Sequence, residues 1–270
     1  MLILALQFYD GDKQEAMALA KLIADIETER RDDVAFVFSA RNGTSADPAV
    51  IRYVEQKFTN VFSTVSKSKR TGWPAGCNDL MAETYAFCIN LVRTKKVQAL
   101  GVLLMEADAV PLAKDWINQL KEEYKLCLDA GKFVMGPWLK KGDAPLEHVN
   151  GNCILHIDFW QKCKVILRPP VFGGWDATLA SNILPHAYPS KLMWSDYHLD
   201  TPRNPWRGCD YLWQAKRYGA KENKLYGQDI FPVWLHAAKG YKAMDCVRDR
   251  LLSQLQLKKK IDMRHLVSSR

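Results

Sequence analysis

The sequence of 270 residues lacks the patterns that mark several common protein classes. Its seven cysteines are an odd number and form no CxxC pair, which argues against a disulfide framework and against a zinc site. The P-loop pattern, GxxxxGK followed by Ser or Thr, is absent. The apolar stretch 1–8 is too short for a signal sequence or for a membrane span of roughly 20 residues. These absences predict a folded, soluble protein of a reducing cytoplasm that makes no contact with a membrane.

Positive charge is concentrated near the C-terminus. The net charge is +8, and between positions 240 and 270 eight Lys and Arg residues stand against three Asp and Glu residues. We expect residues 241–270 to form a basic helical segment. Such a segment often binds a polyanion such as nucleic acid through its phosphates, although a solvated helix face has the same composition.

Strand-like and helix-like segments alternate in the first half of the chain. The pattern of apolar residues predicts strands at 2–9, 34–40, 60–66 and 98–106, and helices at 12–30, 47–58, 75–92 and 113–130. Asp47 is the expected cap of one helix, with Pro48 in its first turn, and Gly131 closes another. This order predicts an α/β fold with a doubly wound, mostly parallel sheet, which binds its ligand at the carboxyl ends of the strands.

The alternation of strand-like and helix-like segments ends in the second half of the chain. Residues 138–240 contain most of the tryptophans and many prolines, arranged in short polar stretches. So many aromatic residues argue against disorder, and a long loop region in a compact domain is usually functional. We therefore expect ordered, irregular loops there.

Two carboxylates follow the fourth expected strand. Glu106 and Asp108 stand at i and i+2, so both side chains would point to one side if the strand continued. Hard oxygen ligands at this end of the sheet suit Mg²⁺ or Mn²⁺. The alternative is that Asp108 or Asp115 caps the helix that follows.

Two further stretches are suited to bind a phosphate or to complete a metal site. Residues 67–81 run from a strand to a helix through three basic residues and the turn-forming Gly72, Pro74 and Gly76, so the free N–H groups at the helix start can bind an anion. A simple Gly/Pro turn is the alternative. Later in the chain, His236 can complete a carboxylate metal site, and Lys239, one turn on, can neutralise a diphosphate. A lone His is more often structural.

Taken in order, "GWPAGCNDLM", "MEADAVP", "HVNGNCILH" and "HAAKG" resemble the GT-A nucleotide-sugar glycosyltransferases. They are most similar to glycosyltransferase-like proteins of bacteriophages and large viruses, some of which modify DNA. The resemblance spans roughly residues 2–240 and implies one catalytic domain there, with a nucleotide-binding half at 1–137 and an acceptor-side half at 138–240. For a viral protein the cytoplasm would be that of the host.

The resemblance also implies roles for individual residues. Glu106-Ala107-Asp108 is a variant of the DxD motif that holds the metal ion and the donor diphosphate, and His236 completes the site. Glu106 replaces the first Asp, so Asp108 is the ligand we expect first. The implied donor-binding residues are Gln7, Phe8, Tyr9, Gly72, Trp73, Asn78 and Lys239. The implied acceptor-binding residues are Asn150, Gly151, Asn152, Trp175, Arg203, Arg207, Lys216 and Arg217. For the sequence Asn-Gly-Asn at 150–152, a hairpin turn is the alternative, and the two interpretations can coexist.

A catalytic base is needed only if the reaction inverts the configuration of the sugar. Asp176 is the candidate, with a helix N-cap as its alternative role, and Asp196, Asp210 and Asp229 are rivals. The whole pattern predicts a glycosyltransferase that uses Mn²⁺ or Mg²⁺ and a nucleotide-diphosphate sugar. The expected acceptor is a hydroxymethylated pyrimidine in double-stranded DNA.

Two alternatives stay open. In the first, the enzyme transfers the sugar to a glycan, lipid or protein; in the second, the chain is a noncatalytic DNA-binding protein. A sugar nucleotidyltransferase shares this type of sheet but needs a Gly-rich loop after the first strand, which "QFYDGDKQEAM" does not provide.

Overall fold

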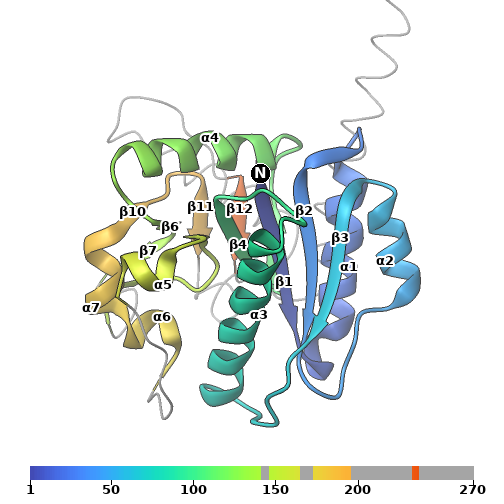
Figure 1. Ribbon diagram of the computed structural model, residues 1–270, viewed down its shortest axis with the longest axis horizontal. Coiled ribbons are helices and arrows are strands. Elements are labelled where there is room, and N and C mark those ends of the chain that lie inside the picture. The colour runs from blue at the N-terminus through green and yellow to red at the C-terminus, as the bar shows by residue number, and fades with distance from the viewer. Residues whose placement is uncertain (141–145, 165–172, 196–232, 237–270) are drawn as a thin grey trace, which may run out of the picture.

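A computed structural model describes residues 1–140, 146–164, 173–195 and 233–236 of the chain. Its main element is a seven-stranded sheet with the strand order β10-β6-β9-β4-β1-β2-β3 (Figure 1). These strands are β1 (Leu2–Phe8), β2 (Arg31–Ala40), β3 (Phe58–Val65), β4 (Gly101–Glu106), β6 (Val134–Gly136), β9 (Ile154–His156) and β10 (Ala187–Pro189). The four strands expected in the first half are all present, and their ends differ from the expected ones by up to three residues.

The sheet is mostly parallel, as the sequence predicted. Strand β1 pairs in parallel with β2 and β4, β2 pairs in parallel with β3, and β6 with β10. Only β9 is antiparallel to its neighbours β4 and β6 within the described sheet. The chain moves outward from β1 to β2 and β3, and then returns to the other side of β1 with β4. The carboxyl ends of β1 and β4 therefore form a topological switch point, where such sheets bind ligands.

Four long helices connect these strands. They are α1 (Lys13–Ile26), α2 (Pro48–Glu55), α3 (Ala75–Arg93) and α4 (Trp116–Asp129). The side chain of Asp47 accepts the N–H of Ala49 at 2.7 Å and caps α2, as expected. Helix α2 ends earlier than the sequence predicted, because β3 already begins at Phe58. Gly131 follows α4 with φ +69°, a left-handed conformation that favours glycine.

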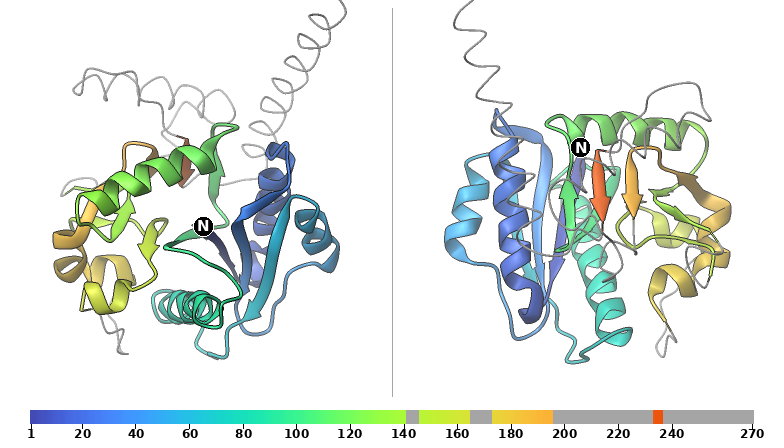
Figure 2. Two further views of the ribbon diagram at one scale, coloured as in Figure 1. Left: turned by 45° about the horizontal axis from the view of Figure 1, so that its top comes forward. Right: turned by 180° about the vertical axis from the view of Figure 1, so that it is seen from behind.

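The alternating side chains of the central strands fill two separate cores. In β1, Leu4 and Leu6 belong to the core with α1, α2 and α4, whereas Ile3 and Ala5 belong to the core with α3. The two views in Figure 2 show α1 and α2 on one face of the sheet and α3 on the other. Because every residue from Leu2 to Leu6 is buried, β1 is a continuous apolar run, as is typical of a strand covered on both faces.

Two small sheets and several short helices complete the described part. Strands β5 (Ala109–Pro111), β11 (Met193–Ser195) and β12 (Trp234–His236) form one sheet, and β7 (Trp138–Leu139) pairs with β8 (His148–Val149). The short helices are η1 (Asp10–Asp12), α5 (Phe159–Lys162), α6 (Trp175–Thr178), α7 (Ala180–Ile183) and η2 (Leu184–His186). Strands β8 and β9 lie in different sheets, so the hairpin interpretation of 150–152 was wrong.

No helix in the described ranges is long and apolar enough to cross a membrane. The basic segment expected at 241–270 lies outside the described residues. The division of residues 1–240 into a nucleotide-binding half and an acceptor-side half also stays a prediction. The same holds for a cytoplasmic location.

Candidate metal centre

The two expected carboxylates lie at the topological switch point. Glu106 is the last residue of β4 and is paired in register with Gln7 of β1. Asp108 lies in the turn between β4 and β5. The helix-cap interpretation of Asp108 was wrong, because β5 follows it directly. Asp115, the other candidate cap, does occupy the N-cap position of α4, without a capping hydrogen bond to its side chain.

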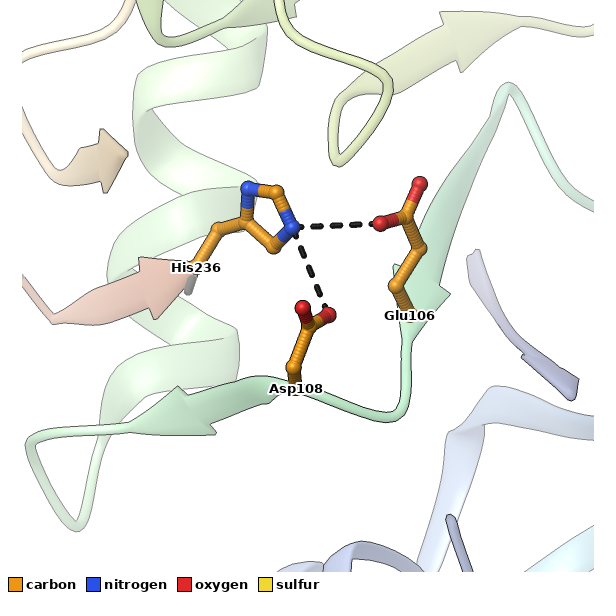
Figure 3. A group of neighbouring side chains, drawn as sticks. All are labelled: Glu106, Asp108 and His236. Atoms are coloured by element: carbon orange, nitrogen blue, oxygen red, sulfur yellow. Dashed lines mark hydrogen bonds and ion pairs between the residues drawn. The ribbon is translucent and has the colours of Figure 1, made fainter. Parts of the chain in front are cut away.

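The three-stranded sheet of β5, β11 and β12 brings His236 to these carboxylates, although His236 and Glu106 are 130 positions apart in sequence (Figure 3). Strand β12 runs antiparallel to β5 and pairs His236 with Ala109, which immediately follows Asp108. The Nε2 atom of His236 lies 3.1 Å from Oε2 of Glu106 and 3.4 Å from Oδ1 of Asp108. The tryptophan rings of β12 and α4, Trp234 and Trp116, stack at 4.8 Å between centroids and hold β12 in place.

Charge explains how two carboxylates and one imidazole can share this place. Burial alone would favour the neutral imidazole of His236. The hydrogen bonds and negative charges of Asp108 and Glu106 outweigh burial and raise the pKa of His236 to about 10. In the metal-free protein an imidazolium therefore balances part of the carboxylate charge.

The same three side chains fit a divalent metal ion. One ligand atom from each of Glu106, Asp108 and His236 lies within 4.8 Å of the others, among the residues that the structure describes. Two carboxylate oxygens and one imidazole nitrogen suit Mn²⁺, whereas Mg²⁺ prefers oxygen ligands alone. An ion here would take the place of the proton on Nε2.

The loop at 150–152 lies directly against the metal cluster. The side-chain oxygen of Asn152 accepts the backbone N–H of Glu106 at 3.1 Å, and the Asn152 side chain is fully buried. A side chain at Gly151 would approach Oε1 of Glu106 to 3.4 Å and Oδ2 of Asp176 to 3.5 Å. Gly151 thus lies between two carboxylates and places no side chain between them.

Asp176 is a third acidic residue of this region, beside Glu106 and Asp108. Its Oδ2 accepts the N–H of Gly151 at 3.0 Å, its Oδ1 accepts the N–H of Ala177 at 2.9 Å, and Nε2 of His148 lies 3.7 Å away. Asp176 lies in the first turn of α6, whose cap position is Gly174, so the N-cap interpretation was wrong. Burial raises the pKa of Asp176 and the charge of Glu106 adds to this effect, whereas His148 and the two N–H groups oppose it.

The start of α3 lies next to Asp176. The side chain of Asn78 donates to the carbonyl of Gly173 at 3.0 Å and accepts the N–H of Trp175 at 2.8 Å, so it ties the loop before α6 to α3. Trp73 is 72% exposed, and its Nε1 atom lies 3.8 Å from the position of a Cβ at Gly174. The Oδ1 atom of Asp176 lies 2.6 Å from the same position.

Other expected donor-binding residues lie at the end of β1. The Gln7 amide donates to Oγ1 of Thr84 at 3.0 Å, the side chain of Phe8 is buried in the core, and Tyr9 is exposed. Gly72 has φ +74° in the turn before α3. Trp175, by contrast, was expected to bind the acceptor, and its indole packs into the core on the α3 side.

Sequence reasoning missed Arg41, which follows β2 at the same edge of the sheet. Its guanidinium lies 5.4 Å from the centre of the Tyr9 ring and next to Gly76. The position of a Cβ at Gly76 is also only 2.9 Å from the backbone oxygen of Arg70, so glycine is favoured there. The Nε atom of Arg41 is buried and has no hydrogen-bond partner among the described residues. A basic residue just after a strand is a weak indicator of a binding site, because the direction of its side chain depends on how the strand pairs with its neighbours.

Several predicted residues fall in the ranges that the structure leaves undescribed. These are Lys239, Arg203, Arg207, Lys216, Arg217 and the rival bases Asp196, Asp210 and Asp229. Their roles stay predictions.

Solved glycosyltransferase structures have a similar fold. The glycosyltransferase GlyE of Streptococcus pneumoniae TIGR4 matches with a TM-score of 0.52 and 11% identity, over 95% of this chain and 63% of that chain. The bifunctional glycosyltransferase WbbM matches with a TM-score of 0.53 and 12% identity, over 93% of this chain and 49% of that chain. The chain thus spans about half to just under two thirds of these structures. No protein-family model and no curated protein matches the sequence.

At such low identity the likeness concerns the fold alone. It confirms the expected GT-A-like α/β fold with a mostly parallel central sheet. The narrower resemblance to phage and DNA-modifying proteins stays a prediction.

Proposed function

We propose that the chain is a metal-dependent glycosyltransferase that moves a sugar from a nucleotide-diphosphate sugar to an acceptor hydroxyl. One observation carries the proposal: Glu106, Asp108 and His236 converge at the switch point of a sheet whose fold two glycosyltransferases share. A bound divalent ion would act there as a Lewis acid on the leaving diphosphate. Asp108 and His236 would hold the ion, and Glu106 would complete the site.

The donor is proposed to lie across the carboxyl ends of β1 and β4. The pairing of Gln7 with Glu106 puts the end of β1 beside the metal cluster, which supports donor contacts from Gln7 and Tyr9. Arg41 is added to this set, because its cationic guanidinium faces Tyr9 and the start of α3. A guanidinium suits the diphosphate or the base of a nucleotide.

Asp176 is proposed as the base for an inverting reaction. Gly151 and Ala177 donate to its two oxygens and fix its direction, and its raised pKa makes it a better proton acceptor than an ordinary aspartate once ionised. The neighbouring Gly151 places no side chain between Asp176 and Glu106, which supports close approach of an acceptor to Asp176. Trp73 lies near Gly174, two positions before Asp176 in sequence, so its exposed ring also suits an acceptor.

The acceptor is proposed to be a hydroxymethylated pyrimidine in double-stranded DNA. This choice is supported by the resemblance to DNA-modifying viral enzymes and by the basic C-terminal composition. The target base would have to leave the stack to reach the donor sugar. The glycan, lipid and protein acceptors remain the alternative class, and a neutral acceptor gives no steep dependence of affinity on salt.

A donor-hydrolysis and transfer assay tests the proposal. The full chain is incubated with Mn²⁺ and a panel of nucleotide-diphosphate sugars, with and without hydroxymethylated DNA, and the released nucleoside diphosphate is measured. We expect release with at least one donor, a loss of at least a hundredfold in Asp108→Asn, and faster release with DNA. Release that glycans accelerate and DNA does not would reject the DNA acceptor alone.

No release with any donor would reject the glycosyltransferase. A chain that binds DNA equally well before and after Asp108→Asn, without any release, would then be a noncatalytic DNA-binding protein.

A further inference from the structure

Ser195, which the sequence analysis did not select, contacts the imidazole ring of His236 on the side away from the carboxylates. Its Oγ atom lies 3.0 Å from Nδ1, and both side chains are buried. The other ring nitrogen, Nε2, faces Glu106 and Asp108 (Figure 3). The ring is therefore held at both nitrogens.

The backbone builds this contact. Strands β11 and β12 are parallel, and their register pairs Ser195 directly with His236. Strand β12 also pairs His236 with Ala109 of β5, next to Asp108. One three-stranded sheet thus carries the serine, the histidine and the carboxylate turn in fixed positions.

A buried carboxylate anchors the beginning of β11. Glu123 of α4 accepts the hydroxyl of Ser190 at 2.5 Å and the N–H of Lys191 at 2.6 Å. The Ser190 oxygen in turn accepts the N–H groups of Leu192 and Met193, at 3.1 and 2.9 Å. The strand that presents Ser195 is therefore fixed at its start by a closed set of hydrogen bonds.

The chemistry of imidazole gives the contact a direction. A metal-ligating histidine uses the lone pair of one ring nitrogen, so its hydrogen must lie on the other. If Nε2 faces the ion, Nδ1 carries the hydrogen, and the Ser195 oxygen is the atom that accepts it. We propose that Ser195 is a positioning residue, which holds His236 with its Nε2 lone pair directed at a divalent cation. This inference rests on the metal centre of the proposed function.

Direct binding of Mn²⁺ tests the inference without any sugar donor. The free aqueous Mn²⁺ is followed by its electron paramagnetic resonance signal during titration of the full chain. We expect Ser195→Ala to weaken binding by 10- to 100-fold, the usual effect of removing a partner of a ligating histidine. Ser195→Thr keeps the hydroxyl and suits a strand, so its affinity should stay within about threefold of the wild type.

A matched control separates this role from a general loss of packing. Ser39 is also a buried strand serine, with its hydroxyl 2.6 Å from Oγ1 of Thr84, but it contacts no proposed metal ligand. Ser39→Ala should keep the wild-type affinity for Mn²⁺. If Ser195→Ala fails to fold, Ser195→Cys, which retains a weak acceptor, should show a smaller loss of affinity in the same direction.

The outcomes separate this inference from the function on which it rests. Equal Mn²⁺ affinity in wild type and Ser195→Ala, or equal losses in Ser195→Ala and Ser39→Ala, would overturn the role of Ser195 and leave the metal centre intact. A wild-type chain that binds no Mn²⁺ would overturn both. Donor hydrolysis that persists in excess chelator would reject the metal-dependent function by a separate measurement.

Discussion

Asp12, at the end of the turn after β1, is a carboxylate whose surroundings disfavour its charge. Its Oδ1 accepts the N–H of Tyr9 at 2.7 Å, but burial raises its pKa to about 6, and the charges of Glu15 and Asp108 oppose ionisation further. Because the pKa is higher in the folded than in the unfolded chain, the favourable contribution of Asp12 is complete below about pH 4. It is lost as the pH rises through about 6.

We expect Asp12→Asn, which imitates the protonated form, to leave the free energy of unfolding unchanged below pH 4. Above pH 7 it should raise that free energy by roughly 1 kcal/mol, after allowance for solvent screening of a partly exposed group. Urea unfolding of both proteins in chelator, from pH 4 to pH 8, measures the difference. Asp10→Asn at the exposed neighbouring position is the control, and a difference independent of pH would contradict the prediction.

Helices α3 and α6, next to the metal centre, are joined by the hydrogen bonds of one side chain, Asn78. Asn78 of α3 provides both a donor to Gly173 and an acceptor for Trp175, and it is buried. Removing it leaves the buried N–H of Trp175 without its partner, at a cost of about 1–3 kcal/mol, and frees the partly buried carbonyl of Gly173. Helix α6, which carries Asp176, would then lose its tie to α3 and its fixed distance to the metal cluster.

Asn78→Ala should therefore lower the free energy of unfolding by about 2 kcal/mol and lower the transfer rate more than it lowers Mn²⁺ affinity. Chemical unfolding, a transfer assay and Mn²⁺ titration measure the three effects. Asn90→Ala, at an exposed position of the same helix, is the control. A transfer rate that falls only in step with Mn²⁺ affinity would show that Asn78 does not act through Asp176.

The elements also show which parts of the structure the sequence could predict. Strands β1 to β4 and helices α1 to α4 were predictable, because each is long enough for a clear hydrophobic period, and Asp47 and Gly131 mark helix ends. Strands β5, β11 and β12 have three residues each, too few for any period. Their pairing is decided by contacts between distant segments.

The residues of the metal centre were predictable from their chemistry, whereas the residues that depend on strand pairing were not. Glu106, Asp108 and His236 were selected by their chemistry, and the structure brings them together. Ser195 and Arg41 could not be selected, because an ordinary serine or arginine acquires its role only from strand register and from the direction of its side chain.

At the scale of the whole molecule, the metal ligands join distant parts of the chain. Glu106 ends a strand of the central sheet, and His236 comes from the small sheet 130 positions later. An ion that binds all three side chains binds the folded protein and not the unfolded chain. It should therefore stabilise the entire fold by mass action.

We expect Mn²⁺ at about 100 times its dissociation constant to add about 2.7 kcal/mol to the free energy of unfolding and to raise the melting temperature by several degrees. Asp108→Asn should abolish most of this increase. Thermal unfolding at a series of Mn²⁺ concentrations measures it, with Asp129→Asn at an exposed position of α4 as the control. An equal increase in Asp108→Asn would mean that Mn²⁺ binds elsewhere.

The pairing of Ser195 with His236 has a consequence for how this protein can diverge. These residues are neighbours in space but 41 positions apart in sequence, so their contact depends on the register of β11 and β12. Both residues belong to the three-stranded sheet of β5, β11 and β12. A change in the sequence or length of the interval between positions 195 and 236 can therefore accumulate while the serine and the metal ligands keep their places in this sheet.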